Sequence, residues 1–144
     1  MGAMSVAHVV VTPLKRVSVD GGDVMHAMKC GDPGFAGFGE AYFSSIERGA
    51  VKAWKRHLRM TLNLVVPVGK VRFVLIDDDG AMREELLGPD RYARLTLPPG
   101  IWFGFSGLAA PYSLVLNLAD IPHDPGEVER KPESEFPIQW ESKA

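Results

Sequence analysis

The chain has 144 residues, and its charge and composition are those of an ordinary globular protein. Sixteen Lys and Arg against eighteen Asp and Glu give a formal net charge of −2, and 46% of the residues are hydrophobic. This balance argues against binding nucleic acid through a strongly positive surface. The length suits a single domain with its own core, and no apolar run approaches the roughly 20 residues of a membrane-spanning helix. We therefore expect neither nucleic acid nor membrane as a partner.

The two ends and the single cysteine set the expected domain limits and compartment. Residues 1–5, in which two Met flank Gly-Ala, are interpreted as a cloning scar, so residues 6–144 are expected to form one domain. The start lacks the basic region and apolar stretch of a signal peptide. Cys30 has no second cysteine with which to form a disulfide within the chain. We expect a cytoplasmic protein.

Short runs of β-branched, apolar and aromatic residues alternate with turns along the whole chain, which contains 15 Gly and 11 Pro. Many short strands at such spacing predict an all-β sandwich or barrel with little helix. Residues 79–87 are the best candidate helix, but Gly80 interrupts them, and they could equally be a turn followed by a strand. In chain order, the predicted strands are 8–11, 24–28, 41–46, 62–66, 71–76, 94–97, 101–105 and 112–118.

The C-terminal region has a different composition from the rest. Residues 121–137 are rich in Pro and charge, which predicts an irregular segment that lies over the barrel. Phe136, Ile138 and Trp140 then alternate with other residues, which predicts a last short strand that docks back onto the barrel.

Residues 49–69 resemble the first cupin motif, Gly-x5-His-x-His-x4-Glu-x6-Gly, and residues 98–103 resemble the second, Pro-x-Gly-x2-His. The resemblance implies a cupin jelly-roll barrel, a double-stranded β-helix. The metal-ligand positions of the two motifs hold Lys55, His57, Leu62 and Phe103. Leu and Phe cannot coordinate a divalent ion and a Lys ammonium repels one, so we expect no metal and no cofactor. A metal-dependent cupin enzyme is therefore disfavoured.

Five segments are informative in their order along the chain: residues 39–44, 51–57, 63–78, 98–105 and 138–140. Together they resemble the dTDP-4-dehydrorhamnose 3,5-epimerase superfamily, and the resemblance covers residues 13–140. Residues 52–57 are also similar to the Arg-Gly-x-His-x-His motif of the sugar-nucleotide 3,4-ketoisomerases. This resemblance implies a cofactor-independent epimerase or keto-isomerase that acts on a nucleoside-diphosphate-linked 4-keto-6-deoxyhexose in polysaccharide or deoxysugar biosynthesis. It also implies a homodimer in which an N-terminal strand, here residues 6–11, crosses to the partner.

The resemblance assigns three catalytic candidates: Lys55, His57 and Glu133. Lys55 takes the position of the epimerases' histidine base, and Glu133 corresponds to the acidic residue that orients that base. The position of the epimerases' tyrosine acid falls at Leu116 or Asn117, neither of which can donate a proton as a phenol does.

Strand alternation places Ala53, Lys55 and His57 on one face and Lys52 with Trp54 on the other. If Lys55 and His57 point into the barrel, they lie about 7 Å apart along the strand. Lys55 could then be a base with a lowered pKa, or it could stabilise an enolate while His57 moves the proton. In the alternative interpretation, Lys55 faces solvent and His57 is a core residue.

A short basic cluster around residues 52–59 suits a diphosphate, and Lys52 matches a phosphate-binding arginine of the epimerases, although a solvated or dimer-facing charge run is the alternative. Trp102 could stack on a nucleobase or fill the core. A second functional hypothesis is a non-catalytic sugar-nucleotide-binding or regulatory cupin. The predicted substrate-binding residues are Lys52, Glu40, Arg59, Asn63, Trp102 and Asn117.

Overall fold

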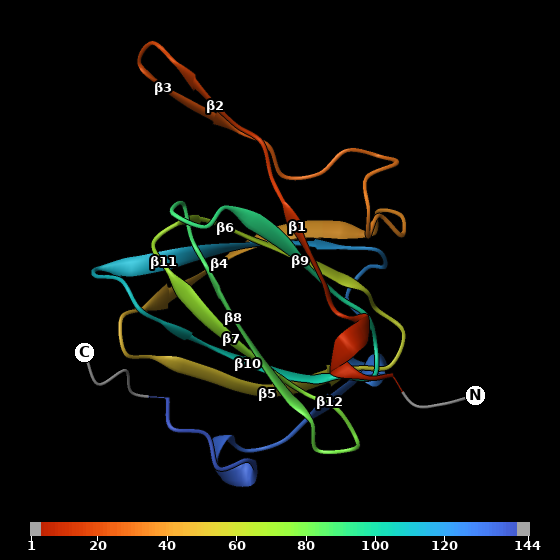
Figure 1. Ribbon diagram of the computed structural model, residues 1–144. Coiled ribbons are helices and arrows are strands. Elements are labelled where there is room, and N and C mark those ends of the chain that lie inside the picture. The colour runs from red at the N-terminus through yellow and green to blue at the C-terminus, as the bar shows by residue number, and fades with distance from the viewer. Residues whose placement is uncertain (1–3, 141–144) are drawn as a thin grey trace.

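A computed structural model describes residues 4–140; the first three residues of the predicted cloning scar and residues 141–144 lie outside this range. Two five-stranded antiparallel sheets face each other, in the orders β1-β9-β6-β11-β4 and β12-β5-β10-β7-β8, and β2 and β3 form a separate hairpin (Figure 1). The strands are β1 (Val10–Pro13), β2 (Arg16–Val19), β3 (Gly22–Met25), β4 (Glu40–Glu47), β5 (Val51–His57), β6 (Leu62–Val68), β7 (Val71–Ile76), β8 (Met82–Leu87), β9 (Ala93–Leu97), β10 (Trp102–Gly107), β11 (Tyr112–Ala119) and β12 (Val128–Arg130).

The expected all-β architecture is confirmed. Helical structure in the described residues is limited to three short 3-10 turns, η1 (Val6–His8), η2 (Pro125–Glu127) and η3 (Glu133–Glu135). Residues 79–87 form a turn followed by β8, because the Asp77 carboxylate accepts the backbone N–H groups of Asp79 and Ala81, both at 3.0 Å, and closes the turn. Within residues 4–140, no helix has the length and apolar character needed to cross a membrane.

Side-chain alternation builds one core between the sheets and a smaller cluster outside them. On β7, Val71, Phe73 and Leu75 point into the main core and are completely buried. Val74 and Ile76 point to the opposite face, where Trp54, Trp102 and Trp140 complete the outer cluster. Because β7 is buried on both faces, its sequence is almost continuously apolar.

The C-terminal segment covers this outer cluster and contributes one strand. β12 pairs with the edge strand β5, and Trp54 Nε1 donates a hydrogen bond to the Glu133 carbonyl (3.1 Å). The ring of Phe136 meets the ring of Trp54 edge-on, with centroids 4.9 Å apart. The predicted last strand over residues 136–140 is wrong, because these residues dock through their side chains without joining a ladder.

The N-terminal segment also differs from the expected strand over residues 6–11. Ser5 caps η1 by accepting the Ala7 N–H (3.1 Å), and the Val6 N–H donates to the Asp77 carboxylate (2.9 Å), so the chain turns before β1 begins. β1 then pairs with β9 of its own sheet. The β2–β3 hairpin extends away from the barrel (Figure 1). The predicted homodimer stays a prediction.

The turn between β6 and β7 depends on Gly69. Its φ is +88°, and a Cβ added there would lie 2.7 Å from the Ser113 Cα. We expect Gly69→Ala to lower the free energy of unfolding by about 2–4 kcal/mol, from left-handed strain together with the steric clash. Gly80→Ala is the matched control, since Gly80 has φ +82° with no atom within 4 Å of an added Cβ. Urea unfolding measures both variants, and equal losses would contradict the steric part of the prediction.

Candidate functional site

An irregularity in β5 determines which side chains enter the barrel. The β10–β5 register pairs Phe103 with Lys55 but Gly104 with Ala53, so Trp54 is an extra residue in the ladder. Ala53 and Trp54 therefore both pack on the outer cluster. Lys52 lies on the same inner face as Lys55 and His57, and the strict alternation expected from the sequence, which put Lys52 on the opposite face, is wrong.

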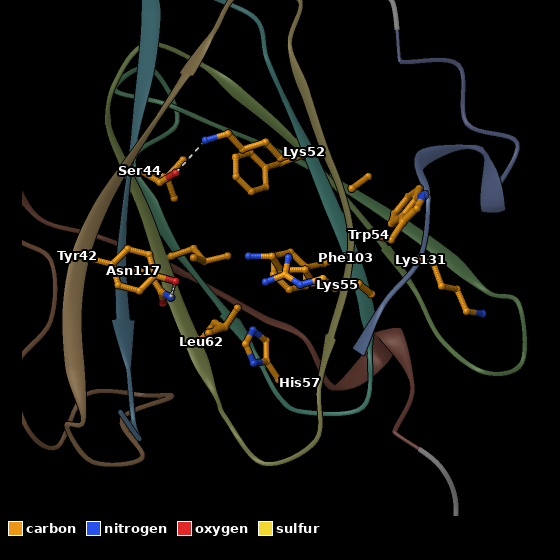
Figure 2. A pocket seen from close by; sticks show the side chains of 15 residues that line it. Tyr42, Ser44, Lys52, Trp54, Lys55, His57, Leu62, Phe103, Asn117 and Lys131 are labelled. Atoms are coloured by element: carbon orange, nitrogen blue, oxygen red, sulfur yellow. Dashed lines mark hydrogen bonds between the residues drawn. The ribbon is translucent and has the colours of Figure 1, made fainter. Parts of the chain in front are cut away.

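The inner face opens into a cavity of about 420 Å³ between the two sheets. Figure 2 shows Lys52, Lys55 and His57 entering it from one wall and Tyr42 and Asn117 standing on the opposite wall. The apolar part of the lining comes from both sheets and consists of Leu62, Leu64, Phe103, Phe105 and Val115. Among the described residues that line this cavity, none is an Asp or a Glu.

His57 is held in place by a buried carboxylate from η2. Its Nδ1 contacts Glu127 Oε1 in a short hydrogen bond. The side chain of Glu127 is only 2% exposed, and its Oε2 accepts the backbone N–H groups of Leu58 (3.2 Å), Arg59 (3.1 Å) and Met60 (3.1 Å). With Nδ1 turned toward Glu127, the imidazole presents Nε2 to the cavity (Figure 2).

The same contacts keep Glu127 ionised. Its burial acts to raise the pKa, but the hydrogen bond from His57 and the N–H groups of Arg59 and Met60 outweigh that effect, so the pKa lies below its ordinary value. A buried carboxylate on Nδ1 fixes the ring orientation and stabilises the imidazolium that forms when Nε2 takes a proton. The pair is therefore built as an oriented base.

Besides Lys131, whose ammonium lies over the Trp102 ring of the outer cluster, three basic residues line the cavity together with this base: Lys52, Lys55 and Arg130. Lys52 Nζ donates to Ser44 Oγ (3.1 Å) and to the Ser45 carbonyl (2.7 Å). No carboxylate from the described part of the chain forms an ion pair with any of the three. Burial lowers the pKa of Lys55, and the charges of Arg130 and Lys52 lower it further.

Tyr42 and Asn117 supply the polar groups of the opposite wall. Asn117 Nδ2 donates to the Tyr42 hydroxyl oxygen (2.9 Å), which leaves the phenolic hydrogen available to a ligand in the cavity. Asn117 Oδ1 is buried and has no hydrogen-bond partner within residues 4–140. This wall can therefore both donate to a bound molecule and accept from it.

A dTDP sugar isomerase from Desulfovibrio desulfuricans G20 shares 39% sequence identity, with a TM-score of 0.88 over 92% of this chain and 90% of that one. The chain belongs to the dTDP-sugar isomerase family. No family model matches the sequence, and none of the curated proteins does.

Solved structures of lower sequence identity share the fold of this chain. The sugar 3,4-ketoisomerase QdtA from Thermoanaerobacterium thermosaccharolyticum, in complex with TDP, has 17% identity and a TM-score of 0.76 over 88% of this chain and 90% of that one. The 3,5-epimerase RmlC from Legionella pneumophila has 14% identity and a TM-score of 0.79 over 95% and 82%. The predicted cupin fold is thereby confirmed.

In this dTDP-sugar isomerase family member, the cupin ligand positions do not suit a metal. Lys55, Leu62 and Phe103 line the cavity beside His57, and none of the three offers the donors that a divalent ion takes. Within residues 4–140, no group of three His, Cys, Asp or Glu side chains is gathered.

The prediction that Glu133 is the acid that orients the base is wrong. It lies on η3 outside the barrel, where its backbone carbonyl accepts from Trp54, and Glu127 holds His57 instead. Sequence reasoning misplaced this acid because both glutamates lie in the same irregular segment, which has no periodicity to set its register.

Four predicted substrate-binding residues also lie outside the cavity. Asn63 points to the other face of β6, where it bonds to Thr96 Oγ1 (2.5 Å) and the Gly34 carbonyl (3.0 Å). Trp102 belongs to the outer cluster. Arg59 is exposed and pairs with Asp124 (2.7 Å), and the Glu40 carboxylate accepts the His123 N–H. Each of the four side chains therefore has a contact within the protein and none lines the cavity.

Tyr42, Ser44, Glu127 and Arg130 line or support the cavity, although the sequence analysis did not select them. The alternation of 41–46 could have indicated that Tyr42 and Ser44 share a face. No local signal marks Glu127 or Arg130, because their positions depend on how η2 and β12 dock against β5.

Proposed function

We propose that this family member is a cofactor-independent epimerase or keto-isomerase that acts on a nucleoside-diphosphate-linked 4-keto-6-deoxyhexose. The observation that carries the proposal is the Glu127-held imidazole of His57, which faces a cavity with a phenol on the opposite wall. Both reactions begin when a base removes a proton beside a ketone. A base, an acid and a nearby cation are what this chemistry requires.

The charge of the cavity supports an anionic, nucleotide-linked substrate. Lys52, Lys55 and Arg130 line a space without carboxylates, and phosphate groups satisfy such cations. Solved structures that share the fold include QdtA in complex with TDP-4-keto-6-deoxyglucose and RmlC in complex with dTDP-4-keto-L-rhamnose. A dTDP-linked keto sugar is therefore the first substrate to test.

The side chains fit the steps of the reaction in order. His57 Nε2 removes the proton from the carbon beside the ketone, and Glu127 stabilises the imidazolium. Negative charge then develops on the substrate, and Lys55, on the same strand as His57, is a cavity side chain that can neutralise it. Tyr42, on the opposite wall, is placed to return a proton to the other face of the sugar, which is the requirement for epimerisation (Figure 2).

Deuterium uptake tests the proposal directly. Incubation with dTDP-4-keto-6-deoxyglucose in deuterated water should introduce deuterium at C3 or C5 if the reaction is epimerisation, or at C4 of a 3-keto product if it is keto-isomerisation. NMR and mass spectrometry of the recovered sugar nucleotide detect either label. Binding of the sugar nucleotide without any uptake would support the regulatory alternative and contradict enzymatic activity. Neither binding nor uptake with several 4-keto sugar nucleotides would contradict the proposed substrate class.

The phosphate-binding role of Lys52 makes a separate prediction. Lys52→Ala should weaken the binding of dTDP by about 10–100-fold, because a hydrogen bond between charged groups contributes about 1.5–3 kcal/mol. Isothermal titration calorimetry measures the change. Lys15→Ala is the control, since Lys15 is exposed and lies outside the cavity. Equal affinities for the two variants would remove Lys52 from the site.

A further inference from the structure

Lys55 has an environment that a simple phosphate ligand would not need. Its strand neighbours are Phe103 on β10 and Arg130 on β12, so an aromatic ring and a guanidinium flank it on either side. Its side chain is about half-buried and enters the cavity two residues before His57 (Figure 2). Within the described residues, no carboxylate is present among the cavity-lining side chains to stabilise its charged form.

These surroundings make the ammonium of Lys55 less stable than that of an exposed lysine. Desolvation and the nearby cations Arg130 and Lys52 all act on Lys55 in the same direction and lower its pKa. A lysine that is desolvated beside another cation becomes a nucleophile toward carbonyl carbon, since only the neutral amine has a free electron pair. Lys52 differs, because its ammonium is held by Ser44 and Ser45 at the cavity edge.

We propose that Lys55 activates the substrate covalently, by forming an iminium with the C4 ketone of the nucleotide-linked sugar; this inference rests on the proposed function. The Lys55 amine attacks C4, the carbonyl oxygen takes one proton from the attacking nitrogen and one from solvent, and loss of water leaves a positively charged C=N bond. His57 then removes a proton from C3 or C5, and the C–H electron pair forms a C=C bond while the C=N π pair moves onto nitrogen. The product is an uncharged enamine, in which the nitrogen of Lys55 is bonded to C4.

The remaining steps restore the enzyme. Protonation of the enamine carbon from the Tyr42 side inverts the configuration and regenerates the iminium. Addition of one water molecule and release of the amine give the epimeric ketone and free Lys55, so the water lost in the first step is regained and one proton returns to solvent. His57 then loses its extra proton and Tyr42 regains one by exchange with solvent. No oxidant or reductant takes part, and the net reaction is an isomerisation.

This route selects epimerisation over keto-isomerisation. A shift of the carbonyl from C4 to C3 through the enamine would leave nitrogen on a tetrahedral C4, where no C=N bond remains for water to hydrolyse. The substrate would then stay attached to Lys55. The inference therefore specifies an epimerase at C3 or C5, and it predicts that the released product remains a 4-ketone.

Reductive trapping tests the iminium. Wild-type protein is incubated with dTDP-4-keto-6-deoxyglucose and sodium cyanoborohydride, which reduces the C=N bond to a stable secondary amine. Intact mass should rise by the mass of the sugar nucleotide less one oxygen atom, and peptide mapping should place the adduct on Lys55. dTDP-glucose, which has no ketone, should give no adduct under the same conditions.

Variants separate this inference from the proposed function. Lys55→Arg keeps the positive charge but should lose both the adduct and deuterium uptake, whereas Lys52→Arg should still give the adduct. His57→Asn should form the adduct and fail to exchange deuterium. Uptake by the wild type without an adduct, an adduct on another lysine, or uptake by Lys55→Arg at the wild-type rate would each overturn the iminium and leave the proposed function standing. Absence of both uptake and adduct would overturn both.

Discussion

Replacing His57 by Asn is expected to lower the rate of deuterium uptake by about 10²–10⁴-fold, the contribution typical of a positioned general base. The Asn amide nitrogen can stand where Nδ1 now contacts Glu127, so the buried carboxylate keeps a donor. What is lost is Nε2, the nitrogen that faces the cavity. The variant should therefore fold normally and bind the sugar nucleotide, yet fail to remove the substrate proton.

Two measurements accompany this prediction. Thermal unfolding followed by circular dichroism should give a melting temperature near that of the wild type, and calorimetry should give a similar affinity for dTDP. Uptake at more than about a tenth of the wild-type rate in a well-folded His57→Asn protein would show that another group is the base. Lys55 would then be the group to test, since it lies two residues before His57 on the inner face of β5.

Much of the fold could be predicted from the sequence because its signals are local. Runs such as 62–66 and 71–76 are apolar on both faces, and Gly69 marks the turn between them, so strand positions followed from composition and turn chemistry. The C-terminal region gave no such signal. β12 has only three residues and forms because β5 presents an open edge, which is a tertiary effect.

The site was predictable in part for the same reason. Lys55 and His57 share a strand, and alternation correctly placed them on one face. Alternation failed at Lys52 because the extra residue at Trp54 shifts the phase, and a single bulge leaves no periodic trace in the sequence. Glu127 is 70 residues from His57, so its role depends entirely on how the segment after β11 returns to the edge of the sheet.

Glu127 links catalysis and stability in one side chain. One carboxylate oxygen holds the imidazole, and the other gathers three consecutive backbone N–H groups that follow β5. The Leu58 N–H also donates to the Glu127 backbone carbonyl (2.8 Å), but without the carboxylate the N–H groups of Arg59 and Met60 would lose this acceptor, which is costly for buried or part-buried groups. Glu127 therefore both positions His57 and fixes the loop that follows β5. A substitution of Glu127 is expected to affect catalysis and stability together.

Glu127→Gln should consequently lower both activity and stability. The amide cannot serve the imidazole and all three backbone N–H groups, because one of its two ends is now a donor. We expect the rate of deuterium uptake to fall by about 10²–10⁴-fold, as when the carboxylate of a catalytic histidine is replaced by an amide. The free energy of unfolding should fall by about 1–3 kcal/mol at neutral pH, from the loss of charge-assisted hydrogen bonds.

The pH dependence of this loss distinguishes an ionised Glu127 from a merely well-packed one. Because the folded protein holds the pKa of Glu127 below its ordinary value, the charge stabilises the fold above that ordinary value, and the stabilisation disappears as the pH falls through the folded pKa. The stability difference between wild type and Glu127→Gln, measured by urea unfolding, should therefore shrink on acidification. Glu129→Gln is the matched control on β12, since Glu129 is exposed and its pair with Arg56 contributes at most about 1 kcal/mol. A difference that stays constant with pH, or activity equal to that of Glu129→Gln, would show that the carboxylate charge does not hold the base.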